Sequence, residues 1–216
     1  ALRIGDVTGD GLDDIAALII EPIQGEGGDN HFRGEFMREL RRLADQYDFM
    51  LIFDEVQSGV GLTGRMWAYQ NFDVKPDMVA FGKKMQVCGF MAGERVNEVD
   101  SVFKVSSRIN STWGANLADM ARAQRYLEVI AEEKLVENAR LRGDSLVERL
   151  EELCRAYPNM ISQARGRGLM AAFDLPSTEL RDRFLDACYD RKMIVLASGT
   201  ISVRFRPALN VTNAEI

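Results

Sequence analysis

Two charged side chains directly follow apolar runs, and their positions could support chemistry. Asp54 ends the run at residues 49–53, and Lys83 follows the run at residues 77–82. Runs of this length and composition predict buried strands. In an α/β sheet, ligands bind at the carboxyl ends of the strands. The sequence therefore predicts a carboxylate and an amine at one edge of a sheet, where a ligand would lie.

An amine and a carboxylate at such positions suit an enzyme that uses pyridoxal 5'-phosphate (PLP). The amine can form a Schiff base with the cofactor aldehyde, and the carboxylate can keep the pyridine nitrogen protonated so that the ring accepts electrons. Burial disfavours a charged carboxylate, so a cationic partner such as the pyridinium would keep Asp54 ionised. Lys84 is the rival amine, but on an extended segment its side chain points away from that of Lys83.

The elements that must position these residues follow from hydrophobic periodicity. A strand at 15–21, a helix at 35–47 and the strand before Asp54 predict a parallel strand–helix–strand crossover. A further strand is expected at 87–92. Later in the chain, the expected elements are helices at 116–136, 139–157 and 178–192 and strands at 168–175, 193–196 and 201–205.

Six short motifs occur along the chain in a fixed order. They are EPIQGEGG at 21–28, FDEVQSG at 53–59, GLTG at 61–64, FGKK at 81–84, NSTWG at 110–114 and VRFRP at 203–207. In this order they resemble the class III (ω-amino acid) aminotransferases over nearly all of the chain from about Asp14 onward. Within that family the chain looks most like the lysine 6-aminotransferases, with the 4-aminobutyrate aminotransferases next.

The resemblance implies an α/β fold. Residues 1–141 would form the second half of the large PLP-binding domain of fold type I, with its mostly parallel sheet and a connecting helix. Residues 142–216 would form a small α+β carboxyl-terminal domain, incomplete at its end. Such enzymes are about twice as long as these 216 residues, so the chain is expected to be the carboxyl-terminal half of a larger enzyme. The family also implies a homodimer with shared active sites.

On the cofactor side, the resemblance assigns roles to five residues. Lys83 would bond to PLP and move the proton, and Asp54 would hold the pyridine nitrogen. Gln57 would hydrogen-bond the cofactor 3-oxygen, although it also suits a plain turn. Thr112, with Ser111 beside it, would reach the cofactor phosphate of the partner subunit, because hydroxyl and backbone N–H groups suit phosphate oxygens. Ser111 alone also fits a helix cap.

On the substrate side, Arg204 matches the arginine that grips a substrate carboxylate with a bidentate fork. Glu26 matches a glutamate that pairs with this arginine for one substrate and swings away for the other. Arg206 is expected to be a surface or interface charge. Glu55 is expected to have a structural or gating role, and the run at 165–168 is expected to be a turn into a strand.

The function implied is transfer of the terminal amine of L-lysine to 2-oxoglutarate, giving 2-aminoadipate 6-semialdehyde and glutamate. An alternative within the family is a 4-aminobutyrate or other ω-amino acid aminotransferase. An alternative of another class is a truncated fragment without catalysis, and the 216 residues alone are expected to be inactive.

Composition excludes several classes of protein. The net charge of −6 argues against a nucleic-acid surface, and no apolar run reaches the length of a membrane span. The single histidine, His31, is expected to be structural or exposed, so no metal site is expected. Three scattered cysteines without a CxxC pair indicate reduced thiols and a cytoplasmic protein.

Overall fold

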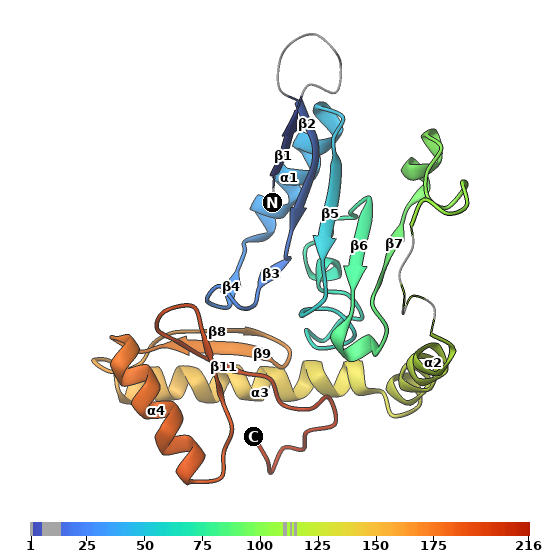
Figure 1. Cartoon of the computed structure of the whole chain (residues 1–216). Coiled ribbons are helices and arrows are strands. Elements are labelled where there is room, and N and C mark those ends of the chain that lie inside the picture. Colours follow the sequence, from blue (N-terminus) through green and yellow to red (C-terminus); the bar gives the residue numbers. More distant parts are fainter. Residues whose placement is uncertain (1, 6–13, 110–111, 113, 115) are drawn as a thin grey trace. The chain divides into compact units, whose positions relative to one another are not determined.

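The computed structural model describes residues 2–5, 14–109, 112, 114 and 116–216. They form two compact units (Figure 1). The first unit comprises Ala1–Pro22, Arg33–Gln57 and Tyr69–Glu128, and the second comprises Ile23–Phe32, Ser58–Ala68 and Val129–Ile216. No helix in the described part of the chain is long and apolar enough to cross a membrane.

A five-stranded mixed sheet forms the first unit. Its strands are, in spatial order, β1 (Leu2–Gly5), β2 (Asp14–Ile20), β5 (Met50–Asp54), β6 (Met78–Phe81) and β7 (Gly89–Ala92) (Figure 1). The central strands β2, β5 and β6 are parallel, while β1 and β7 run antiparallel at the two edges. The α/β class predicted from the sequence is confirmed.

Helix α1 (Gly34–Gln46) connects β2 to the parallel β5, as the expected crossover requires. Its apolar stripe buries Met37 and Ala44, and the helix packs against β5. Leu51 and Phe53 of β5 are fully buried. The first unit is completed by short 3₁₀ helices, η1 (Ala68–Asn71), η2 (Lys83–Met85) and η3 (Glu94–Glu98), and by most of α2 (Leu117–Glu132).

Asp77 holds the start of β6 to the strand beside it. Its Oδ2 accepts hydrogen bonds from the backbone N–H of Leu51 (2.8 Å), from Nη1 of Arg41 on α1 (3.0 Å) and from Nη1 of Arg95 on η3 (3.3 Å). The backbone N–H of Asp77 also donates to the Leu51 carbonyl at 2.8 Å. One carboxylate therefore joins α1, β5, β6 and η3.

The second unit contains an antiparallel sheet in the order β10 (Leu196–Ser198), β11 (Ser202–Phe205), β9 (Met170–Asp174) and β8 (Ser162–Arg167). Helix α3 (Leu135–Ala156) packs against β8 and β9, and α4 (Thr178–Asp190) contacts β10 and β11. One buried hydrophobic cluster of this unit comprises Leu146, Leu150, Ala171, Phe173, Leu175 and Val203. A two-stranded hairpin, β3 (Ile23–Gln24) and β4 (Asn30–His31), belongs to this unit.

The two units divide the chain differently from the expected boundary at residue 141. The division falls at Glu128, and the early segments 23–32 and 58–68 belong with the carboxyl-terminal part. Hydrogen bonds explain why the hairpin does so: Ser198 Oγ donates to the Gly25 carbonyl at 2.6 Å, and Arg165 Nε donates to the Asp29 carbonyl at 2.9 Å. Such long-range bonds carry no local sequence signal.

Two elements also differ from their expected positions. The break between the two long helices lies at Lys134, which is left-handed with φ 53°, and not near residues 137–138. The run at 165–168 is mostly strand β8, where a turn was expected. A register irregularity between Ser162 and Arg165, with Gln163 at φ 55°, interrupts the alternation by which a strand is recognised.

The backbone of helix α3 packs closely against the backbone of the turn between β8 and β9. A Cβ placed on Gly143 would lie 2.2 Å from the carbonyl carbon and oxygen of Gly168. Gly168 itself has φ 54°, in the region that favours glycine, and a Cβ on it would lie 2.5 Å from the Thr63 carbonyl carbon. Both positions therefore require glycine.

We expect Asp77→Ala to lower the free energy of unfolding of the first unit by about 2–3 kcal/mol, because two largely buried arginines and one backbone N–H lose their shared acceptor. Urea unfolding measures the change. Asp45→Ala is the matched control, because Asp45 pairs with the same Arg41 at 2.7 Å but is 66% exposed, against 12% for Asp77. The control is expected to change stability by less than about 0.5 kcal/mol. Equal losses in the two variants would contradict the role given to Asp77.

We expect Gly143→Ala to destabilise the second unit by about 2 kcal/mol, because the clash with backbone outweighs the gain of about 1 kcal/mol in helix propensity. Thermal unfolding is the measurement. Gly93→Ala serves as a control, since a Cβ there meets only the Asp77 carbonyl oxygen, at 3.6 Å. A Gly143→Ala protein as stable as the wild type would show that α3 does not need this close approach.

Candidate active site

Lys83 opens the turn that follows β6. It is the first residue of η2 and has φ 47°, which is uncommon for a residue with a side chain and recurs at functional sites. Gly82 before it is buried, and a Cβ there would lie 3.1 Å from Cys88 Sγ. The Lys83 side chain is exposed, although the sequence indicated a buried strand around it. Among the described residues, none hydrogen-bonds or forms an ion pair with its amine.

The neighbouring Lys84 is in a different situation. It is half-buried, and its Nζ donates a hydrogen bond to the backbone carbonyl of Gln57 at 2.6 Å. This bond ties the turn after β6 to the segment after β5. Of the two adjacent amines, Lys84 is thus held by the protein, and Lys83 is available to a ligand.

Asp54 is the last residue of β5 and pairs in register with Ala80 of the parallel strand β6. Its Oδ1 accepts a hydrogen bond from the backbone N–H of Val56 at 3.0 Å, and the side chain is half-buried. In the described part of the chain no partner engages Oδ2. Asp54 and Lys83 therefore follow the carboxyl ends of adjacent parallel strands, which is the position predicted for them.

Glu55, next to Asp54, has a structural role. It is 1% exposed, its N–H donates to the Ala80 carbonyl at 2.9 Å, and its Oε1 accepts from the N–H of Tyr69 at 2.8 Å. Burial, together with the Glu55 carboxylate, raises the pKa of Tyr69. Gln57 is half-buried, and the assignment of its side chain to a cofactor oxygen stays a prediction.

The second unit brings together the two residues predicted for substrate binding. Arg204 on β11 places Nη1 2.8 Å from Oε2 of Glu26, in the turn between β3 and β4. The Arg204 side chain is 12% exposed and that of Glu26 is 74% exposed. Neither Nε nor Nη1 of Arg204 makes a hydrogen bond of good geometry with any described residue. The pair is therefore an ion contact with unused hydrogen-bonding capacity on the buried arginine.

Arg206 was expected to be a surface or interface charge, and the structure shows that it is not a surface charge. Its side chain is 16% exposed and forms a short ion pair with Asp29, which is fully buried. Burial lowers the pKa of Arg206, and the Asp29 carboxylate opposes this change. Asp29 was not predicted from the sequence. The signal was present as two acidic residues, 26 and 29, in one glycine-rich turn and two arginines, 204 and 206, at the end of one strand.

His31 contacts the same carboxylate, with Nε2 3.2 Å from Oδ1 of Asp29. Burial lowers the pKa of His31, while the hydrogen bond and the charge of Asp29 oppose that shift. A neutral ring with its proton on Nε2 donates to Asp29 and leaves Nδ1 as the atom without a described partner. His31 is thus structural, one of the two roles expected for it.

The structure places only one of the two residues predicted to reach a partner subunit. Thr112 lies in an exposed turn, and Ser111 lies outside the described residues. Their assignment to a cofactor phosphate stays a prediction.

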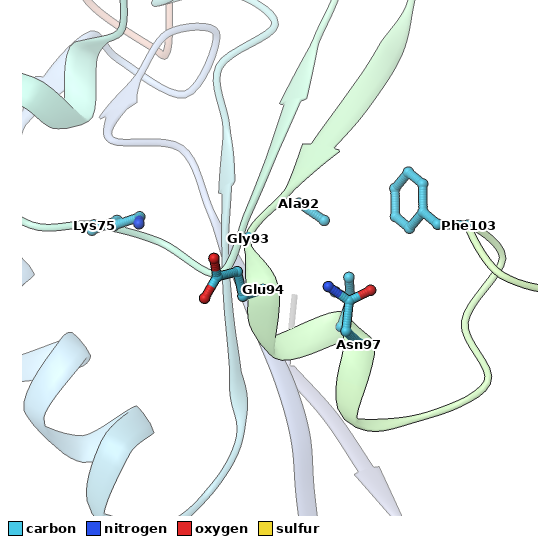
Figure 2. A pocket seen from close by; sticks show the side chains of 7 residues that line it. Lys75, Ala92, Gly93, Glu94, Asn97 and Phe103 are labelled. Carbon is cyan, nitrogen blue, oxygen red and sulfur yellow. The ribbon is translucent and has the colours of Figure 1, made fainter.

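A cavity of about 400 Å³ lies near the amino-terminal side of β6, away from the strand ends that carry Asp54 and Lys83. Figure 2 shows Lys75, from the segment before β6, and Asn97 and Phe103, from the chain after β7, around it. None of the predicted site residues lines this cavity. The cavity therefore gives no support for the catalytic roles predicted for Asp54 and Lys83.

Comparison with known proteins places these features in a family. The sequence profile described as "Aminotransferase class-III" matches residues 3–216. The L-lysine-epsilon aminotransferase of Mycobacterium tuberculosis (strain ATCC 25618 / H37Rv) is 58% identical over 204 residues, which cover 94% of this chain and 45% of that protein. The mitochondrial 4-aminobutyrate aminotransferase of Homo sapiens is 34% identical, over 90% of this chain and 38% of that protein.

Solved structures agree. The structure titled "Lysine aminotransferase from M. tuberculosis in the internal aldimine form" matches with a TM-score of 0.91 and 58% identity, over 93% of this chain and 46% of that one. An ornithine aminotransferase from Plasmodium yoelii matches with a TM-score of 0.83 and 26% identity, over 92% and 53%. The chain spans about half the length of the relatives it matches. With a family profile that covers residues 3–216 and strand ends that carry Asp54 and Lys83, the chain belongs to the class III aminotransferases.

Proposed function

We propose that the protein to which this chain belongs transfers the ε-amine of L-lysine to 2-oxoglutarate with the help of PLP. The observation that carries the reaction class is the available amine of Lys83 at the end of β6, beside the strand that ends in Asp54. The donor is favoured by sequence, because the chain is 58% identical to an L-lysine-epsilon aminotransferase and 34% identical to a 4-aminobutyrate aminotransferase.

The residues of the first unit fit PLP chemically. An amine without a described partner suits an aldehyde, and a carboxylate whose second oxygen is unengaged suits a protonated ring nitrogen. Lys84 does not compete, since its Nζ is held by the Gln57 carbonyl. When bound, PLP supplies an aldehyde that accepts the amine and a ring that accepts electrons.

The protein residues then divide the work. Lys83 would hold the cofactor through Nζ, and the same amine would act as the base that moves the proton at the carbon bearing the donor amine. Asp54 would hold the protonated ring nitrogen with its unengaged carboxylate oxygen, while its Oδ1 remains bonded to the N–H of Val56. Gln57 is assigned to the cofactor 3-oxygen, and Thr112 with Ser111 to the phosphate held by the partner subunit of a homodimer.

Two residues of the second unit, Arg204 and Glu26, are assigned to distinguishing the two substrates. 2-Oxoglutarate reacts at its α-carbon, which bears a carboxylate, and Arg204 offers that carboxylate a planar fork with unused donors. Lysine reacts at its ε-carbon, which bears no carboxylate, so Glu26 pairs with Arg204 while lysine is bound. A Glu26 side chain that is 74% exposed can leave the arginine for water at little cost.

A direct assay distinguishes this proposal from two alternatives, a 4-aminobutyrate aminotransferase and a fragment without catalysis. Purified natural protein is expected to form glutamate from L-lysine and 2-oxoglutarate at about 1 per second or faster, and more slowly from 4-aminobutyrate. Faster turnover of 4-aminobutyrate would favour the other substrate class. The 216 residues assayed alone are expected to be inactive, and the cytoplasmic location expected from the scattered free cysteines stays a prediction.

We expect Lys83→Ala to abolish covalent attachment of PLP and transamination while the protein remains folded, because no other amine is available at the strand end. Borohydride reduction followed by peptide mapping locates the attachment. Lys84→Ala is the matched control and should retain both the attachment and most of the activity. A pyridoxyl group recovered on Lys84 would reverse the assignment.

Asp54→Asn should bind PLP but lower kcat by about a hundredfold or more, the effect of removing one electrostatic group from an active site. The amide oxygen can still accept from the N–H of Val56, so the local turn is preserved. Asp73→Asn makes the same change of charge at an exposed position of the first unit and should leave kcat unchanged. Normal turnover of Asp54→Asn would remove this residue from the mechanism.

A further inference from the structure

Two carboxylates and two arginines meet in the second unit. Arg204 lies on β11 (Ser202–Phe205) and Arg206 directly follows the end of that strand, and both side chains are largely buried. Glu26 and Asp29 lie three residues apart in the turn between β3 and β4. Glu26 pairs with Arg204 and Asp29 pairs with Arg206. Both pairs join the same turn to β11 or to the residue that directly follows it.

The two carboxylates differ in their freedom to move. Asp29 is fully buried with φ 54°, its N–H donates to the Gly25 carbonyl, and its own carbonyl accepts from Arg165 Nε. Its second carboxylate oxygen contacts His31. Asp29 is therefore fixed at both its backbone and its side chain.

Glu26, by contrast, is fixed only at its backbone. Its carbonyl accepts from the N–H of Gly199 at 2.9 Å and from Ser198 Oγ at 3.3 Å. Its side chain is 74% exposed, and the Arg204 contact is the one pairing found for it among the described residues. The turn thus carries one movable and one immovable carboxylate.

Arg206 must be neutralised if Arg204 is to act alone. Its guanidinium is held by the Phe205 carbonyl, at 2.7 Å from Nη1, and by Asp29. It is near enough to Arg204 and Glu26 for each of them to influence its pKa. Without Asp29, the second cation would attract Glu26 and any carboxylate that enters, because charges in a partly buried site are weakly screened.

We propose that Asp29 is a specificity-determining positioning residue: by holding and neutralising Arg206, it leaves Arg204 as the single cation shared between Glu26 and a substrate carboxylate. The inference deepens the proposed function and rests on it for the identity of the two substrates. Asp29 itself does not touch the substrate. Its effect is to let Arg204 bind Glu26 when the donor, which has no carboxylate at this end, is present. Arg204 can then bind the carboxylate of the acceptor instead.

The test is Asp29→Asn in the natural protein, because asparagine tolerates the left-handed backbone and keeps one acceptor oxygen. We expect the KM for L-lysine to rise and the KM for 2-oxoglutarate to fall, so that their ratio shifts by about tenfold or more. Calorimetry should show tighter binding of glutarate, a dicarboxylate that cannot react. An unchanged ratio together with unchanged glutarate affinity would overturn the proposal.

A double variant separates charge from structure. Asp29→Asn combined with Arg206→Gln removes both charges and should return the KM ratio to within about twofold of the wild type, even where thermal stability is not restored. A purely structural role for Asp29 predicts no such return. Should Asp29→Asn alone fail to fold, the double variant still decides, because a tenfold shift in its ratio would contradict the neutralising role.

Asp182→Asn is the matched control. Asp182 pairs with the largely buried Arg181 on α4 at 2.6 Å, so the variant removes the carboxylate partner of another buried arginine in the same unit. It should alter stability without altering the KM ratio. If the wild type does not transaminate lysine, the proposed function is wrong, and the glutarate affinities of the variants still test Asp29. If the wild type is active and Asp29→Asn changes nothing, only the Asp29 proposal is wrong.

Discussion

The parallel pairing of β5 with β6 is the constraint on which the candidate active site depends. It places the carboxyl ends of two strands side by side, so that Asp54 and Lys83 follow the same edge of the sheet. Asp77 secures this pairing from the opposite end of β6, with hydrogen bonds to Leu51, α1 and η3. An aspartate six residues before the lysine thus has a physical purpose, because it fixes where the lysine turn begins.

In the second unit, a few hydrogen bonds likewise fix the position of a site segment. The glycine-rich turn between β3 and β4 is held to the sheet through its backbone, by Ser198, Gly199 and Arg165. Because the backbone is fixed, the two acidic side chains of the turn can differ in mobility without the turn itself moving. A fixed ion pair beside a solvent-exposed one is a means of offering a single cation where two arginines lie at the end of β11.

Local patterns were sufficient for much of the fold and part of the site. The crossover through α1, the strand before Asp54 and helix α4 lie close to where periodicity placed them, because each buries one face of a regular element. Strand β8 was missed because its irregular register interrupts the alternation. The end of the strand before Lys83 was predicted, but the left-handed conformation of Lys83 and the exposure of its side chain were not, because the residues around it are apolar enough to continue a buried strand.

The sequence by itself determined the α/β class, the family and the residue types able to hold a cofactor, since these depend on composition, spacing and the order of motifs. Only the tertiary structure decided which of two adjacent lysines is available, because the answer depends on the Gln57 carbonyl meeting Lys84. It also decided that Arg206 is buried against Asp29. Arg206 and Asp29 lie 177 positions apart in the chain, and the packing of the hairpin on the sheet brings them together. The residues next to each of them in the chain do not determine such a contact.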